Sequence, residues 1–168
     1  QIFDTINSLG VKLTTAELLK NYFFNRDDIE KYNEYWKEVF EKDEETKNYW
    51  DREIIAGRLR RTFIDLFFFA YLQIKIQETD FKVKAEDKDA YAKVEHLFES
   101  YKNFIKNYLN NNKEAILSEI KEYALLFKKN FNYEILGEEL TQDFGIDRIN
   151  TIIFGLDTTT LIPYTLYI

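Results

Sequence analysis

A run of seven residues near the middle of the chain, Leu66-Phe-Phe-Phe-Ala-Tyr-Leu72, is apolar at every position. A helix that is apolar all round has to be buried, either in a protein core or in a membrane. Polar residues limit the run on both sides, at Asp65, Gln73 and Lys75, whereas a membrane span needs about 20 apolar residues. The sequence therefore predicts a long, buried central helix, at about residues 52–77, and no membrane-spanning segment.

Apolar residues recur every three or four positions in several other segments, as they do on one face of an α-helix. The clearest series runs from Tyr91 to Tyr108 in steps of three and four, which is typical of the seam between antiparallel helices. Further series begin near residues 29, 113, 149 and 161, and residues 78–89 and 130–141 read as irregular linkers. Five Gly and one Pro are too few for the many turns of an all-β domain. We expect an all-α fold, a bundle of about six to eight helices.

Composition limits the partners and the chemistry of the chain. The net charge of -7 argues against strong nonspecific DNA binding by the domain as a whole, although a local basic patch is compatible with it. The lack of Cys excludes disulfides, thiolate zinc sites and a cysteine nucleophile. No signal peptide is recognisable, so we expect a cytoplasmic protein. Because the sequence lacks Met and starts and stops within apolar patterns, we expect it to be a piece of a longer protein.

The first two dozen residues hold the most specific local pattern. Gly10 supplies the residue type that helix ends often require. Thr14 stands three residues before Glu17, as in a capping box, and Leu13 and Leu18 are spaced for a hydrophobic staple. The pattern predicts a turn between two helices. It is either an ordinary helical hairpin or a turn that faces a ligand, such as an anion at the new helix N-terminus.

This stretch also resembles a known family. The pattern Phe3-x-x-x-Asn7-x-x-Gly10-x-x-Leu13-Thr14, followed by Glu17-Leu-Leu-Lys-Asn21, is similar to a signature late in the ParB-like N-terminal domain of GmrSD-type restriction endonucleases. The resemblance implies bacterial phage defence, in which nucleotide hydrolysis is coupled to cleavage of modified DNA. It covers residues 1–24, and it divides the chain into the end of a ParB-like domain, residues 1–26, and a helical bundle, residues 27–168.

The resemblance also implies roles for the matched positions. Asn7 and Gly10, with Thr14, would face a nucleotide or DNA, Phe3 and Leu13 would pack the motif, and Lys20 is a weaker phosphate candidate. The family's Asp-Gly-Gln-Gln-Arg motif and its HNH histidines are absent from this sequence. The chain would therefore be catalytically incomplete and hold no cofactor itself. The nucleotide triphosphate, a divalent metal and DNA would bind to the full-length protein, through a further N-terminal part and, in many members, a C-terminal nuclease domain.

Other candidate sites are weaker. Four of the six arginines lie between residues 52 and 61, and Arg58 and Arg61 would share a face of the predicted helix. They could bind phosphate, or they could pair with the preceding acidic segment, residues 27–53. No spacing of residues indicates a metal site, and no catalytic residue is identifiable. His96, the one histidine, reads as a surface residue. The alternative to an enzyme fragment is a non-catalytic helical module that binds DNA or a protein partner.

Overall fold

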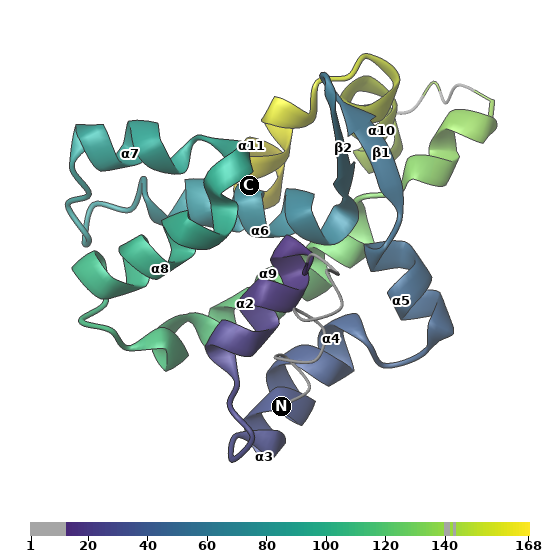
Figure 1. Ribbon diagram of the computed structural model, residues 1–168. Coiled ribbons are helices and arrows are strands. Elements are labelled where there is room, and N and C mark those ends of the chain that lie inside the picture. Colours follow the sequence, from purple (N-terminus) through teal and green to yellow (C-terminus); the bar gives the residue numbers. More distant parts are fainter. Residues whose placement is uncertain (1–12, 140–141, 143) are drawn as a thin grey trace.

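The computed structural model of the chain describes residues 13–139, 142 and 144–168, and it confirms the predicted all-α class (Figure 1). The elements in chain order are α2 (Thr15–Phe23), α3 (Ile29–Tyr32), the π-helix η1 (Asn33–Lys37), α4 (Glu38–Phe40), α5 (Glu44–Trp50), β1 (Glu53–Ala56), β2 (Leu59–Thr62), α6 (Phe63–Lys75), α7 (Ala85–Tyr91), the 3-10 helix η2 (Val94–His96), α8 (Leu97–Tyr108), the 3-10 helix η3 (Lys113–Ile116), α9 (Leu117–Asn130), the 3-10 helix η4 (Tyr133–Gly137), α10 (Ile146–Gly155), the 3-10 helix η5 (Thr159–Leu161) and α11 (Ile162–Tyr167).

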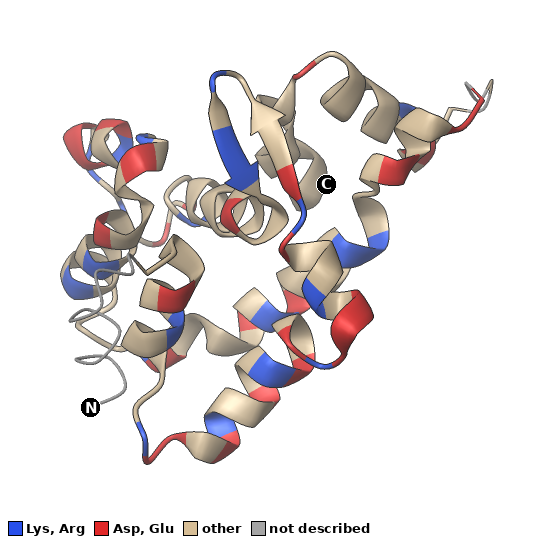
Figure 2. Ribbon diagram, turned by 45° about the vertical axis from the view of Figure 1, so that its right-hand side comes forward, with Lys and Arg blue, Asp and Glu red and all other residues tan. Residues whose placement is uncertain are grey.

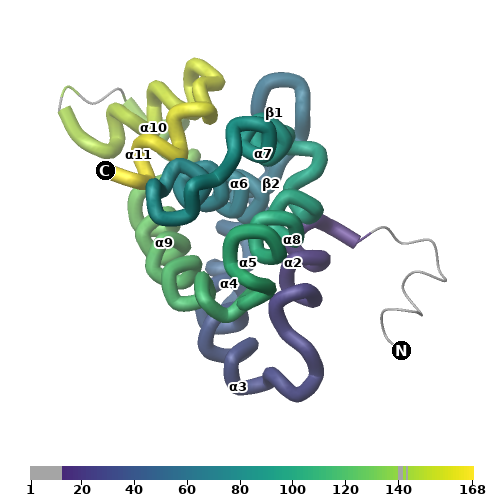
Figure 3. The backbone as a smooth tube through the Cα atoms, turned by 90° about the vertical axis from the view of Figure 1, so that its left-hand side faces the viewer, coloured from purple at the N-terminus to yellow at the C-terminus, as the bar shows by residue number. Residues whose placement is uncertain are grey.

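Helix α6 is the buried central helix that the apolar run predicts. It is 13 residues long, and the residue before it, Thr62, caps its start: the Thr62 hydroxyl accepts a hydrogen bond from the backbone N–H of Asp65. Helices α2, α5, α8, α9 and α11 all pack against it (Figure 3). Among the described residues, none of the helices has the length and apolar character needed to cross a bilayer.

The prediction that this helix begins near residue 52 is wrong. Residues 53–62 form a β-hairpin instead, in which Ile54 pairs with Arg61 and Ala56 with Leu59. Only Gly57 and Arg58 remain for the turn, and Gly57 has a φ of 66°. The first residue of the tight turns that suit hairpins needs a positive φ, which glycine adopts without strain. The neighbouring isoleucines are β-branched and favour a strand, so the local sequence prefers a hairpin to a helix.

The core around α6 is packed with aromatic rings. Phe67 lies 5.6 Å from Trp50 and 5.7 Å from Phe127, measured between ring centroids, and Phe68 stacks on Trp36 at 5.7 Å. Several of the buried rings also form hydrogen bonds through their polar edges. The indole N–H of Trp50 donates to the Val39 carbonyl oxygen at 3.0 Å. Such rings combine a large apolar area with directional hydrogen bonds.

The boundaries of the other helices are only partly as predicted. The Tyr91–Tyr108 series is divided, because Tyr91 ends α7 and α8 begins only at Leu97. The expected linker at 78–89 contains most of α7, and its Phe81 packs edge-on against Phe104. The helices expected near residues 113, 149 and 161 are present as α9, α10 and α11, two of them preceded by a 3-10 turn.

Replacing Phe67 by alanine tests the central role of the ring cluster. Its side chain is fully buried, so Phe67→Ala should lower the free energy of unfolding by about 3–5 kcal/mol. Phe144→Ala is the matched control, because Phe144 is 91% exposed, and it should cost less than about 0.5 kcal/mol. Urea unfolding measures both values. Similar costs for the two variants would contradict this packing.

Gly57→Ala tests the hairpin. An alanine at a φ of 66° is strained, although no atom lies within 4 Å of the added Cβ, so we expect a loss of about 1 kcal/mol. Gly137→Ala is the control, since that position has equal space and no positive φ. Thermal unfolding of both variants compares them. A Gly57→Ala protein as stable as the Gly137→Ala protein would argue for a helix through residue 57.

Candidate functional site

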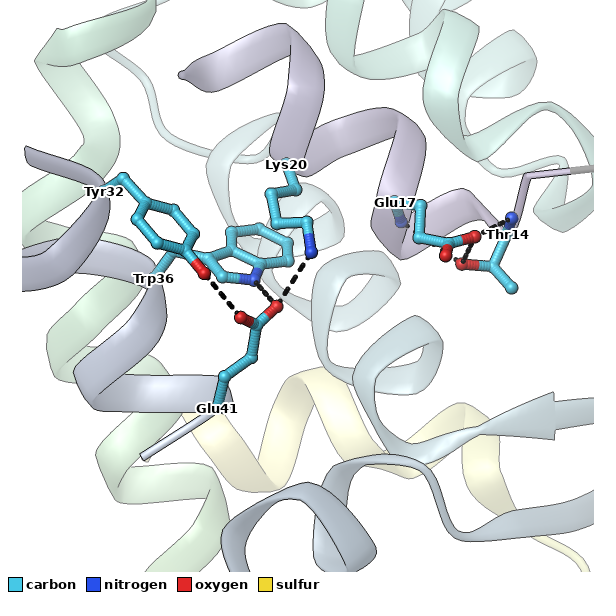
Figure 4. Close-up of polar contacts among 6 residues, drawn as sticks. All are labelled: Thr14, Glu17, Lys20, Tyr32, Trp36 and Glu41. Atoms are coloured by element: carbon cyan, nitrogen blue, oxygen red, sulfur yellow. Dashed lines mark hydrogen bonds and ion pairs between the residues drawn. The ribbon is translucent and has the colours of Figure 1, made fainter. Parts of the chain in front are cut away.

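The described end of the N-terminal motif forms the predicted capping box. The hydroxyl of Thr14 accepts a hydrogen bond from the backbone N–H of Glu17 at 3.2 Å, and the Glu17 carboxylate accepts from the backbone N–H of Thr14 at 2.7 Å (Figure 4). These reciprocal bonds satisfy two N–H groups at the start of α2. Leu13, directly before the cap, is half-buried. The predicted site residues Phe3, Asn7 and Gly10 lie outside the described residues.

Lys20, the phosphate candidate on α2, is paired with a carboxylate. Its ammonium nitrogen lies 2.9 Å from Oε1 of Glu41, which also accepts from the indole N–H of Trp36 at 2.9 Å. Oε2 of Glu41 accepts from the hydroxyl of Tyr32 at 2.6 Å (Figure 4). Both partners of the ion pair are less than one-third exposed. Lys20 is thus part of a bridge between α2 and the end of α4, and its contact with phosphate stays a prediction.

The electrostatics of this cluster favour the ionised form of Glu41. Burial opposes ionisation, but hydrogen bonds from Tyr32 and Lys20, the charge of Lys20 and the bond from Trp36 outweigh it, so the pKa of Glu41 is lowered. Burial and the hydrogen bond to Glu41 raise the pKa of Tyr32 to about 12. At neutral pH the cluster therefore consists of a carboxylate, an ammonium group and two neutral donors.

Two of the donors to Glu41 come from the π-helical turn η1 and the residue before it. Tyr32 directly precedes η1 and Trp36 lies within it, and Glu41 follows the last residue of α4. Sequence analysis missed both the π turn and the role of Glu41, since an apolar series of threes and fours indicates only a helix.

A groove of about 470 Å³ begins at the capping box and runs between α2, α4, α5 and the base of the hairpin. Its wall includes Thr14 and the aromatic rings of Trp36 and Trp50. The charged residues that line it are four carboxylates, Glu17, Glu41, Asp51 and Glu53, and two lysines, Lys20 and Lys47. An excess of two negative charges disfavours the phosphates of DNA or a nucleotide here.

Asp51 is the residue of this groove whose environment fits proton transfer best. Burial, followed by the negative charges of Glu41 and Glu17, raises its pKa, and Lys47 opposes this effect. A carboxyl group with a raised pKa in a groove is a candidate acid or base. Within the described part of the chain, however, no three acidic or histidine side chains converge in a way that could hold a metal ion. The groove could bind a cation or a basic segment more readily than an anion.

The structure separates the two arginines that were predicted to share a helix face and to bind phosphate. Arg58 is exposed in the hairpin turn, whereas Arg61 is buried on β2, so the two do not share a helix face as predicted. Figure 2 shows the basic residues of this region along the turn and β2. Of the neighbouring arginines, Arg60 lies 3.7 Å from Glu53, and Arg52 pairs with Glu134, far along the chain. Among the described residues, Arg60 is therefore the one arginine of the four that pairs with the preceding acidic segment. His96 is exposed, as expected.

Comparisons of the chain with protein-family models, with curated proteins and with solved structures find no match. The resemblance of residues 1–24 to restriction endonucleases therefore stays a prediction. The geometry around Thr14, Lys20 and Glu41 is the basis on which function has to be argued.

Glu41→Gln tests the bridge through its pH dependence. The folded protein holds the pKa of Glu41 below the unfolded value of about 4.3, so the carboxylate adds stability above that pH. This contribution is lost as the pH falls through the lowered folded pKa. We expect Glu41→Gln to lose about 1–2 kcal/mol at pH 7 and to approach the wild type near pH 3.

Urea unfolding between pH 7 and pH 3 measures this difference. The control is Glu38→Gln, because Glu38 pairs with Lys42 but both are 56% exposed, and it should change stability by less than about 0.5 kcal/mol. The ionised bridge would be ruled out if Glu41→Gln were as stable as the wild type at pH 7. It would also be ruled out if the loss in free energy of unfolding were the same at pH 3 as at pH 7.

Proposed function

We propose that this chain is the helical part of a GmrSD-type restriction endonuclease, a phage-defence enzyme whose full-length form cleaves modified DNA with nucleotide hydrolysis in the bacterial cytoplasm. The observation that carries the proposal is the capping box of Thr14 and Glu17. The family-like motif ends in it, and the helix that it starts lines the groove. The motif is therefore joined to a defined cavity wall.

The role of the helical part in this proposal is to hold the motif in place. Helix α2 buries Leu19 and Phe23 in the core, and Lys20 ties it to Glu41. A segment that enters such a helix has one fixed end, which reduces the conformational entropy that ligand binding must overcome. Asn7 and Gly10 would then form the ligand-facing part of the motif, supported by Thr14 and packed by Phe3 and Leu13.

DNA and the nucleotide triphosphate, with its divalent metal, are assigned in this proposal to the rest of the enzyme. The carboxylates of the groove repel phosphates, and the described residues offer no metal-binding group. The chain alone would be inactive. It would contribute positioning, whereas a further N-terminal part and a C-terminal nuclease domain would contribute the chemistry.

The second candidate is a non-catalytic helical interaction module. The observation that favours it is the same acidic lining, which suits a basic segment of a protein partner better than DNA. In this case, Asn7 would be structural and the parent protein would not cleave DNA.

Asn7→Ala in the full-length protein distinguishes the two candidates. If Asn7 contacts a ligand, the variant should lose at least about tenfold of its nucleotide-stimulated cleavage of modified phage DNA, because a hydrogen bond to a charged group is worth about 1.5–3 kcal/mol. The thermal unfolding temperature should remain that of the wild type. Cleavage is followed on phage DNA with and without modified bases, in the presence and absence of nucleotide.

Asn103→Ala is the matched control, because Asn103 is exposed on α8, and it should cleave like the wild type. Failure of the wild-type full-length protein to cleave modified DNA would overturn the restriction-endonuclease proposal and favour the interaction module. Wild-type cleavage by Asn7→Ala would leave the family proposal standing and demote Asn7 to a structural residue.

A further inference from the structure

A second cavity, of about 300 Å³, lies beneath the β-hairpin and away from the groove at the motif. Four parts of the chain form it: the inner face of the hairpin, α6, the turn between α7 and α8, and the segment from Asp157 to Pro163. Its walls are mainly apolar and include Leu59, Leu66, Phe69 and Val94. A cavity that is mostly apolar with a few polar groups is the usual form of a small-molecule site.

Arg61 supplies the charge of this cavity. In the antiparallel register it lies opposite the buried Ile54, so its side chain is on the inner face of the hairpin, and only 9% of it is exposed. The guanidinium lies 5.0 Å from the ring centroid of Phe69, which also lines the cavity. Its Nη2 donates to the backbone carbonyl of Asp65 at 3.4 Å, and its buried Nε has no hydrogen-bond partner among the described residues.

A buried arginine normally has a carboxylate partner, because an uncompensated charge is costly to bury. Among the described residues, no carboxylate oxygen lies within 4 Å of the Arg61 guanidinium. Asp65 and Glu95 attract it from farther away. The carboxylate of Asp157, also in the cavity wall, is bound instead to the backbone N–H of Gly57, at 2.9 and 3.1 Å.

These acidic neighbours restrict the charge of a ligand. The charged residues that line the cavity are Arg61 and Asp157, one of each sign, whereas Asp65 and Glu95 act on the guanidinium from outside the lining. A ligand with one negative charge therefore meets less repulsion from these carboxylates than a phosphate dianion. A carboxylate also fits the planar fork of a guanidinium, which can donate two parallel hydrogen bonds to it. Thr159 and Thr160 also line the cavity, and a threonine hydroxyl can donate a hydrogen bond to a carboxylate.

We propose that this cavity binds a small carboxylic acid with an apolar body, and that Arg61 binds its carboxylate while the walls cover the apolar part. The site is independent of the proposed restriction activity, since it shares no lining residue with the groove at Thr14.

Titration with three probes of similar shape tests the proposal. These are 3-phenylpropionate, the neutral 3-phenylpropanol and the dianionic phenyl phosphate. Amide NMR spectra should show 3-phenylpropionate shifting signals of the hairpin, of Val94 and of Thr159–Thr160, with an affinity at least about tenfold higher than that of the other two probes. Equal binding of the alcohol, tighter binding of the phosphate, or no shift at these residues would each overturn the proposal.

Variants locate the binding at Arg61. Arg61→Gln should weaken 3-phenylpropionate binding at least about tenfold. Arg60→Gln should leave it unchanged, because Arg60 is the next residue on the same strand but is exposed on the outer face. Should Arg61→Gln unfold, Ala92→Trp keeps the arginine and fills the cavity mouth, and it should also abolish binding. Wild-type affinity in the folded Arg61→Gln or Ala92→Trp protein would refute the site.

Discussion

The packing of aromatic rings around α6 is the constraint on which the rest of this structure depends. Phe67 and Phe68 meet rings from α4, α5, α8 and α9, so one helix fixes the relative positions of four others. Ring pairs have preferred geometries and give more than area burial alone. Hydrogen bonds add direction: the hydroxyl of Tyr101 donates to the Phe68 carbonyl, and that of Tyr49 to the Phe131 carbonyl. A core of aliphatic residues would bury similar area without these orienting bonds.

The candidate site is held in place by this core. Trp36 stacks on Phe68 with one face of its ring and donates to Glu41 with its indole N–H, so the carboxylate that binds Lys20 is itself positioned by the ring cluster. Because Lys20 is on α2, a continuous series of contacts connects α6 to the capping box. The hairpin uses the same helix for a different purpose, since it lies over α6 and encloses the cavity of Arg61 between them.

Features encoded within a few neighbouring residues could be predicted from the sequence. The run from Leu66 to Leu72 indicated the buried helix, and Thr14 and Glu17 indicated the capping box. The hairpin was missed because two isoleucines before Gly57 are too short a pattern to distinguish strand from helix. The Glu41 cluster was missed because one acceptor among many carboxylates has no distinctive spacing. The burial of Arg61 depends on four segments that meet only in the folded chain, which no local pattern reports.

The central claim is that α2, which starts at the capping box of Thr14 and Glu17, folds as one unit with α6. Native-state hydrogen exchange at increasing denaturant tests this claim most directly, because it separates local opening from global unfolding. We predict that the amides of Leu19 and Phe23 exchange with the same free energy and the same denaturant dependence as those of Phe67 and Phe68. Exchange of the α2 amides at a clearly lower free energy, with α6 still protected, would show that α2 is not fixed by the core and would contradict this account.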